Sequence, residues 1–179
     1  GLGIEYEGIR EYRFGDDYRR IEWSVSARTP PKPGEENPLF IKQYREEKNL
    51  NVLLILDQSG SMDYRKKVLI GVRAALVMAD LAQRRGDYVG LVCFGNKVNS
   101  FLPPARSGEQ AYRILRTLCR FYRAGGPSNL RTMAIEVARA MRSRSIINLI
   151  TDINHEVSDY VYFTRLMWAG GHIINILLV

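Results

Sequence analysis

Cysteine is scarce in this sequence, and no apolar run is long enough to cross a membrane as a helix. Only Cys93 and Cys119 occur among the 179 residues, each inside an apolar stretch. Such thiols predict two reduced core residues rather than a disulfide or a metal pair, which fits a reducing compartment. A membrane-spanning helix needs about 18 consecutive apolar residues, and residues 1–10 lack the pattern of a signal peptide. We therefore expect a soluble, cytoplasmic domain.

The composition is otherwise that of an ordinary globular protein with a basic surface. Apolar residues make up 46% and charged residues 25% of a chain whose formal charge is +7. This length suits one domain, or one domain with a modest appendage. The basic excess favours acidic proteins, nucleic acid or anionic lipid as partners, without choosing among them.

Two segments of the chain differ in amino-acid composition and hydrophobic pattern. Residues 1–48 are rich in charge, aromatic residues and turn formers, and they include the loop-forming run RTPPKPGEENP. Over residues 49–179, apolar runs alternate with amphipathic stretches. We expect a strand-and-loop appendage followed by an α/β domain with a doubly wound, mostly parallel sheet. The domain ends on HIINILLV without a closing helix, so we expect it to be truncated at its C-terminus.

The alternating elements follow from hydrophobic periodicity. Strands are predicted over 49–57, 87–95, 97–104, 145–152 and 172–179, the third being stopped by Pro103 and Pro104. Helices are predicted over about 64–85, 108–121, 129–143 and 158–169. In such sheets, ligands bind beyond the carboxyl ends of the strands.

Oxygen-bearing side chains follow the first strand, in LILDQSGSM. Asp57, Ser59 and Ser61 alternate along a turn, and Mg²⁺ prefers oxygen ligands in near-octahedral geometry. Asp152 closes SIINLITD, and Ser128 lies in the glycine-flanked run AGGPSNL. Alternatively, the aspartate merely ends a strand and the serines cap the next helix. All five residues together favour a metal site.

This pattern resembles the metal-ion-dependent adhesion site of von Willebrand factor A domains, over about residues 50–179. The resemblance implies that Mg²⁺ or Mn²⁺ mediates protein–protein binding and that a partner's acidic residue completes the metal shell. The implied ligands are Asp57, Ser59, Ser61, Ser128 and Asp152, and the rim or docking residues are Gln58, Met62, Asn129 and His155. In two departures, Ser128 stands where that family usually has Thr, and Ile153 where it often has Gly.

The N-terminal segment carries a second resemblance. GIREYRFGDDYRRIEWSVSAR, with IKQYREEKN before the first long strand, is similar to the bacterial and archaeal "domain of unknown function fifty-eight" family. The matching residues are Gly15, Asp16, Asp17, Arg19, Ile21, Trp23, Ser26, Ala27 and Arg28, and Glu22 replaces the usual Asp. The resemblance implies an adaptor for a MoxR-type AAA+ ATPase. Full-length members often carry membrane helices, so we expect membrane association only through segments outside this chain.

The charged motif of this segment has two interpretations. Asp16, Asp17, Arg19 and Arg28 form ion pairs that hold the appendage to the sheet, with Trp23 as an apolar anchor, or they form a docking surface. We favour the structural role.

An enzyme is the main rival class. Asp57 follows a strand, as the nucleophile of aspartyl phosphatases does, but Ser59 stands where those enzymes have a second aspartate. His155 and His172 lack an obvious nucleophile pair, and no phosphate-binding P-loop is present. We therefore expect a binding module rather than a metal-dependent phosphohydrolase.

A basic helix face gives a further alternative. Arg113, Arg116, Arg120 and Arg123 recur at helical spacing, opposite an arc of Ile114, Leu115, Leu118 and Phe121. We interpret the arginines as a solvated face, and binding of phosphate, anionic lipid or an acidic partner is the alternative. No nucleic-acid recognition motif accompanies them, so we expect no nucleic-acid partner.

Overall fold

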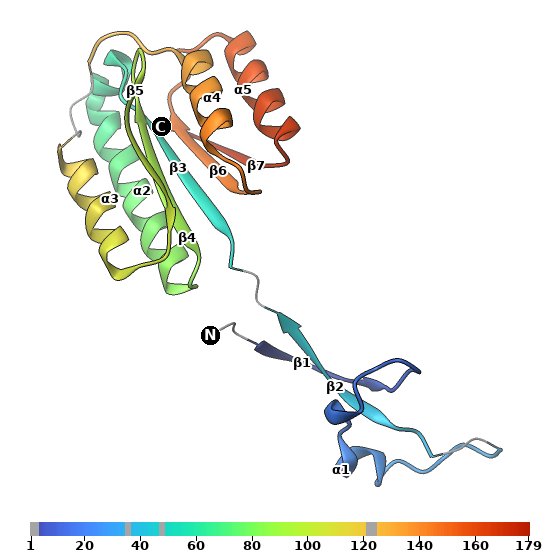
Figure 1. Cartoon of the computed structure of the whole chain (residues 1–179). Coiled ribbons are helices and arrows are strands. Elements are labelled where there is room, and N and C mark those ends of the chain that lie inside the picture. Colours follow the sequence, from blue (N-terminus) through green and yellow to red (C-terminus); the bar gives the residue numbers. More distant parts are fainter. Residues whose placement is uncertain (1–3, 35–36, 47–48, 121–124) are drawn as a thin grey trace. The chain divides into compact units, whose positions relative to one another are not determined.

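The computed structural model describes residues 4–34, 37–46, 49–120 and 125–179. Its contacts divide the chain into two units, residues 1–48 and residues 49–179 (Figure 1).

The N-terminal unit is an antiparallel pair of strands with two short helical turns between them. β1 (Ile4–Glu11) pairs with β2 (Phe40–Glu46), and the 3₁₀ turn η1 (Tyr18–Arg20) and α1 (Trp23–Ser26) lie between them in the chain. The buried hydroxyl of Ser26 accepts the backbone N–H of Phe40 at 2.9 Å and so ties α1 to β2.

The ion pairs of this unit differ from those expected. Asp16 pairs with Arg10 through contacts of 2.7 and 2.8 Å, and these hydrogen bonds, with one from the backbone of Arg13, lower the pKa of Asp16 to about 2. Asp17 instead caps η1 by accepting the backbone N–H of Arg19 at 3.0 Å. Trp23 is 65% exposed and does not anchor the interior of its own unit.

The second unit is built on a five-stranded sheet in the order β5-β4-β3-β6-β7. β3 (Asn51–Asp57) pairs in parallel with β4 (Tyr88–Phe94) and β6 (Ile146–Thr151), and β7 (Ile173–Leu178) pairs in parallel with β6. β5 (Val98–Ala105) is antiparallel to β4 at the edge. The mostly parallel sheet predicted from the sequence is confirmed.

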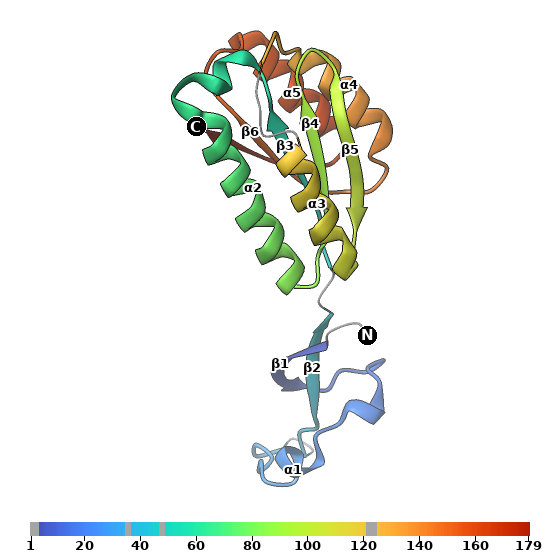
Figure 2. The same cartoon turned by 90° about the vertical axis from the view of Figure 1, so that its left-hand side faces the viewer.

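Helices cover both faces of this sheet (Figures 1 and 2). α2 (Lys67–Arg84) and α3 (Gly108–Arg120) lie on one face, and α4 (Leu130–Ala140) and α5 (Val157–Ala169) on the other. β3 is buried on both sides because its apolar residues alternate between the two faces. Val52, Leu54 and Leu56 pack with α2 and α3, whereas Leu53 and Ile55 pack with α4 and α5.

The third predicted strand is present, but Pro103 and Pro104 do not stop it. β5 continues through Pro103 and Pro104 to Ala105, because proline is tolerated on an edge strand, where one side of the backbone needs no partner. The buried amide of Gln110 donates to the carbonyls of Val89 and Pro103, at 2.8 and 3.0 Å, and so ties α3 to this edge.

α2 begins later than predicted. A 3₁₀ segment, η2 (Gly60–Lys66), comes first and ends at Lys66, whose φ of 59° and ψ of 31° are left-handed. Among the described residues, Lys66 alone has a positive φ without being a glycine. This turn sets the direction in which α2 leaves the loop after β3.

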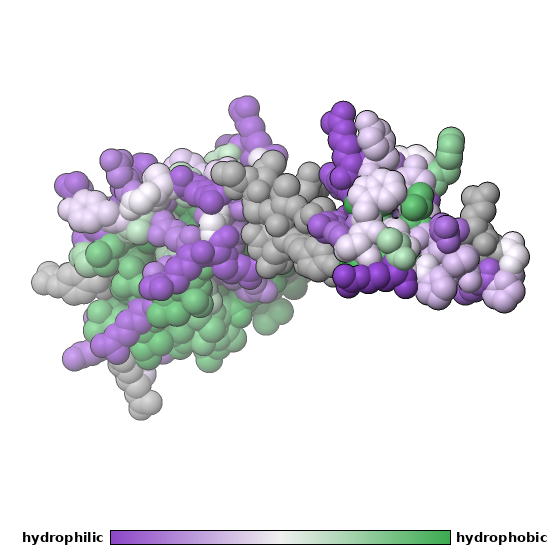
Figure 3. Space-filling model, turned by 90° about the horizontal axis from the view of Figure 1, so that it is seen from below, coloured by the Kyte–Doolittle hydropathy of each residue, from purple (hydrophilic) through white to green (hydrophobic). Residues whose placement is uncertain are grey.

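Two surface features depart from a simple core-and-surface pattern. Cys93 is buried, which raises the pKa of its thiol to about 12, but Cys119 is exposed on α3, so the prediction of two core thiols is wrong for Cys119. Apolar side chains also gather on the surface of the second unit (Figure 3). α2 exposes Ile70, Val77 and Leu81, and β7 exposes Ile173, Ile176 and Leu178. No helix of the described segments is long and apolar enough to cross a bilayer.

Candidate metal centre

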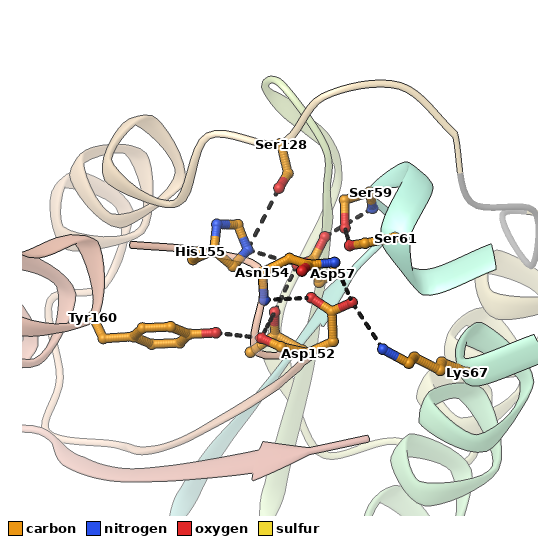
Figure 4. A network of polar contacts seen from close by, with 10 residues as sticks. Asp57, Ser59, Ser61, Lys67, Ser128, Asp152, Asn154, His155 and Tyr160 are labelled. Carbon is orange, nitrogen blue, oxygen red and sulfur yellow. Dashed lines mark hydrogen bonds and ion pairs between the residues drawn. The ribbon is translucent and has the colours of Figure 1, made fainter. Parts of the chain in front are cut away.

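The candidate site lies where the central parallel strands end (Figure 4). Asp57 is the last residue of β3, Asp152 directly follows β6, and Ser128 precedes α4. Both aspartates are fully buried. In front of them lies a cavity of ≈ 350 Å³, lined by Ser59, Ser61, Ser128, Asn154 and His155 among others.

Asp57 is fixed by three hydrogen bonds. Its Oδ1 accepts the backbone N–H of Ser59 at 2.8 Å, and its Oδ2 lies 2.6 Å from the hydroxyl of Thr151 and 2.7 Å from Nε2 of His155. The bond to Asp57 raises the pKa of His155 above its usual value, although burial opposes the shift. His155, predicted at the rim, therefore contacts a candidate ligand directly.

Asp152 is held by a different set of partners. Its Oδ1 accepts the backbone N–H of Asn154 at 3.1 Å, and its Oδ2 lies 3.2 Å from the ammonium of Lys67 and 3.3 Å from Nδ2 of Asn154. Burial raises the pKa of this carboxyl, but bonds from Asn154, Ser61 and Lys67 outweigh it and lower the pKa. The hydroxyl of Tyr160 donates to the backbone carbonyl of Asp152.

The three serines complete the cluster. The hydroxyls of Ser59 and Ser61 are 2.9 Å apart, and the hydroxyl of Ser128 lies 3.4 Å from Nε2 of His155. The loop carrying Ser128 docks on the loop after β3, where the N–H of Gly60 donates to the carbonyl of Gly126 at 2.8 Å. These contacts bring the five residues singled out in the sequence into one cluster.

Three of the predicted rim residues have side chains that are buried or hydrogen-bonded within the chain itself. Met62 is fully buried, and Gln58 is 3% exposed and accepts a hydrogen bond from Asn99 at 3.1 Å. Asn129 is exposed, but its side chain caps α4 by accepting the N–H of Thr132 at 2.9 Å.

Four residues of the site were not anticipated: Lys67, Thr151, Asn154 and Tyr160. Thr151 could have been found, because it directly precedes Asp152 at the end of a strand that leads into the site. Lys67 and Tyr160 carry no comparable signal, since each reaches the site from a helix.

The donor set fits a hard divalent cation. Mg²⁺ takes oxygen ligands at about 2.0–2.1 Å and keeps several waters, and two carboxylates and three hydroxyls supply oxygen only. Among the residues that the structure describes, no three His, Cys, Asp or Glu side chains form a metal cluster, so serine hydroxyls would have to serve as ligands. An uncompensated buried charge costs free energy, and Lys67 at Asp152 and His155 at Asp57 lie where a bound cation would also neutralise these carboxylates.

The basic face of α3 lies outside this cluster. Arg113, Arg116 and Arg120 are exposed, and so are Tyr112 and Leu115 of the same helix. Exposure of Leu115 departs from the predicted apolar arc. Arg123 and Phe121, also predicted on this helix, lie outside the described residues.

Comparison with known proteins places the chain among relatives of similar sequence. It is 30% identical over 161 residues to "Uncharacterized protein Rv1480" of Mycobacterium tuberculosis, covering 85% of this chain and 48% of that protein. It is 26% identical over 111 residues to "Uncharacterized protein YeaD" of Bacillus subtilis, covering 62% of this chain and 25% of that protein. The chain thus spans half or less of the length of these relatives.

A solved structure shows the same fold. Proximal thread matrix protein 1 from the mussel byssus superposes with a TM-score of 0.56 at 17% identity, over 73% of this chain and 38% of that one. With the helices on both faces of the sheet, this likeness supports the predicted α/β fold with a mostly parallel central sheet. The model of the family "Protein of unknown function DUF58" matches residues 8–179. This match covers the whole second unit and most of the first, and the chain belongs to the DUF58 family.

Proposed function

We propose that this chain is a divalent-metal-dependent protein-binding module. Mg²⁺ or Mn²⁺ is held by Asp57, Ser59, Ser61, Ser128 and Asp152, and an acidic residue of a partner protein completes the metal shell. The observation that supports this most is the pair of fully buried carboxylates behind a hydroxyl-lined cavity at the ends of β3 and β6.

The two kinds of side chain have different roles in this proposal. The serine hydroxyls line the cavity and are placed to touch an ion directly. Both carboxylate oxygens of Asp57 already accept hydrogen bonds from the protein, so this residue acts best through water. The bound ion would supply an electrophilic position, open to the cavity, for an anionic oxygen from outside. Neutral hydroxyls offset its charge only weakly, which favours a carboxylate from the partner.

The geometry favours binding over catalysis. In a Ser-His-Asp triad, the histidine contacts serine through one ring nitrogen and aspartate through the other. Here Nε2 of His155 makes both contacts, at 3.4 Å to Ser128 and 2.7 Å to Asp57, so the ring cannot pass a proton between them. Ser59 also leaves a phosphatase mechanism without its second aspartate. We therefore propose no enzymatic activity.

The partner proposed is a MoxR-type AAA+ ATPase, on the basis of the family resemblance. The test is capture of this ATPase, from the same organism, by the purified protein in Mg²⁺ and again after chelation by EDTA. Capture should be lost with EDTA, return with added Mg²⁺, and be absent for Asp57→Asn. Asp80→Asn removes the same charge from the exposed surface of α2 and should not affect capture.

Acidic residues at the contact on the ATPase should then be changed singly to the matching amides. Losing one partner of a buried charged contact costs about 2–5 kcal/mol, so one such change should reduce the affinity as much as EDTA does. Capture that survives both EDTA and Asp57→Asn would contradict the proposal. Turnover of a phosphoester that requires Asp57 would favour the enzyme instead.

A further inference from the structure

Lys67 places a positive charge inside the candidate metal centre. Its ammonium Nζ lies 3.2 Å from Oδ2 of Asp152 (Figure 4). The lysine side chain is 23% exposed, whereas the carboxylate is fully buried. A buried carboxylate is stable only when it is paired or hydrogen-bonded. Lys67 therefore supplies Asp152 with a counter-charge at the position where a cation would otherwise be needed.

The position of this lysine is not explained by the helix that carries it. Lys67 is the first residue of α2, and the N-terminus of a helix favours negative rather than positive charge. The first turn of α2 contains no acidic residue, and its N-cap, Lys66, makes no side-chain capping bond. Two lysines at an uncapped helix start go against the usual preference for a capping residue and for negative charge at this position. Departures of this kind are expected at functional sites.

The backbone before α2 directs Lys67 toward Asp152. η2 ends at Lys66 in a left-handed conformation, with φ at 59°, which is uncommon for a residue with a side chain. The chain then turns into α2, and the side chain of Lys67 reaches across to the loop after β6 (Figure 4). The contact joins residues 85 positions apart in the sequence.

We propose that Lys67 acts as a built-in competitor of the metal ion. Without metal, its ammonium neutralises Asp152, and on metal binding it leaves that carboxylate. The proposal rests on the proposed function, because it concerns the same site. Two cations cannot share Oδ2 of Asp152 without repulsion, so the ion must displace Lys67 at a cost in affinity. By linkage, the free energy by which Lys67 stabilises the metal-free protein is subtracted from the free energy of metal binding. Lys67 is thus a residue that sets the metal affinity.

The test compares the whole chain with three variants at one pH and one ionic strength. Lys67→Met keeps most of the side-chain volume and removes the charge, and Lys67→Arg keeps the charge. Lys66→Met removes the same charge from the exposed neighbouring residue. Calorimetric titration with Mn²⁺ gives the dissociation constant, and thermal unfolding in EDTA gives the stability of the metal-free protein.

Lys67→Met should bind Mn²⁺ about tenfold more tightly than the unmodified protein, and it should unfold at a lower temperature in EDTA. Lys67→Arg and Lys66→Met should bind as the unmodified protein does. In an Asp152→Asn background, Lys67→Met should no longer lower the unfolding temperature, because the carboxylate that needs the charge is gone. This background also covers the case in which Lys67→Met alone does not fold.

The outcomes separate this proposal from the proposed function. If neither the unmodified protein nor Lys67→Met binds Mn²⁺, the metal site itself is refuted, and the competition with it. If the unmodified protein binds and Lys67→Met binds equally or more weakly, the metal site stands and the competition is refuted. Tighter binding by Lys66→Met to the same degree would also refute it, since general surface charge would then account for the effect.

Discussion

Replacing Thr151 by valine removes one hydroxyl from behind the metal centre with almost no change in side-chain size. Thr151 is fully buried, and its hydroxyl donates to Oδ2 of Asp57 at 2.6 Å. A hydrogen bond to a charged group contributes about 1.5–3 kcal/mol, and valine cannot replace it. We therefore expect Thr151→Val to lower the free energy of unfolding by about 1.5–3 kcal/mol.

The same change should also weaken metal binding. Groups that orient a metal ligand through hydrogen bonds typically affect metal affinity by about 10–100-fold when removed. Thr151 is such a group, because it fixes the oxygen of Asp57 that His155 also contacts. Urea unfolding in EDTA measures the stability change, and calorimetric titration with Mn²⁺ measures the affinity change.

Thr164→Val is the matched control. Thr164 lies in α5, and its hydroxyl donates to the carbonyl of Tyr160 within the same helix at 2.9 Å. Loss of this bond should change stability by no more than about 0.5 kcal/mol and leave Mn²⁺ binding unchanged. If Thr151→Val is as stable as the unmodified protein and binds Mn²⁺ equally well, Thr151 does not hold Asp57 in the way described.

Two further predictions concern the fold. A methyl group at Gly90 would lie 2.7 Å from the carbonyl oxygen of Leu102, a backbone atom of β5, so Gly90→Ala should destabilise the protein by about 1–3 kcal/mol in urea unfolding. Gly108→Ala should not destabilise the protein, because no atom lies within 4 Å of the position that its methyl group would take. Burial lowers the pKa of His172, so the folded state keeps it neutral while the unfolded state takes up a proton below about pH 6.5. The free energy of unfolding should therefore fall as the pH is lowered from about 6.5 to the pKa of His172 in the folded state. His172→Gln should reduce this pH dependence.

Local patterns in the sequence were sufficient for the architecture and for the candidate ligands. The sequence of β3 is almost entirely apolar because both faces of this strand are buried, and such a run can be recognised without knowing the neighbouring strands. Asp57 and Asp152 each follow such a run, so the sheet topology alone brings them to one edge. The serines are close to these residues, or in a glycine-flanked loop, and the same reasoning places them.

Features that depend on distant packing could not be predicted in this way. The contact of Lys67 with Asp152 requires the 3₁₀ segment before α2, and nothing in the sequence indicates how far that segment rotates the helix start. Met62 lies in the same run as the serines, and only the turn geometry shows that it points into the core. Cys119 has an apolar neighbourhood in sequence, but α3 turns it outward.

The central claim is that the ends of β3 and β6 bind a divalent metal ion. The most direct measurement is calorimetric titration of the purified chain with Mg²⁺ and Mn²⁺, beside Asp57→Asn and the surface control Asp80→Asn. We predict saturable binding of one ion per chain, kept in Asp80→Asn and lost in Asp57→Asn. At a hundredfold excess over the dissociation constant, the ion should stabilise the native state by about 2.7 kcal/mol. Equal binding and equal stabilisation in Asp57→Asn, or no binding by the unmodified chain, would contradict the claim.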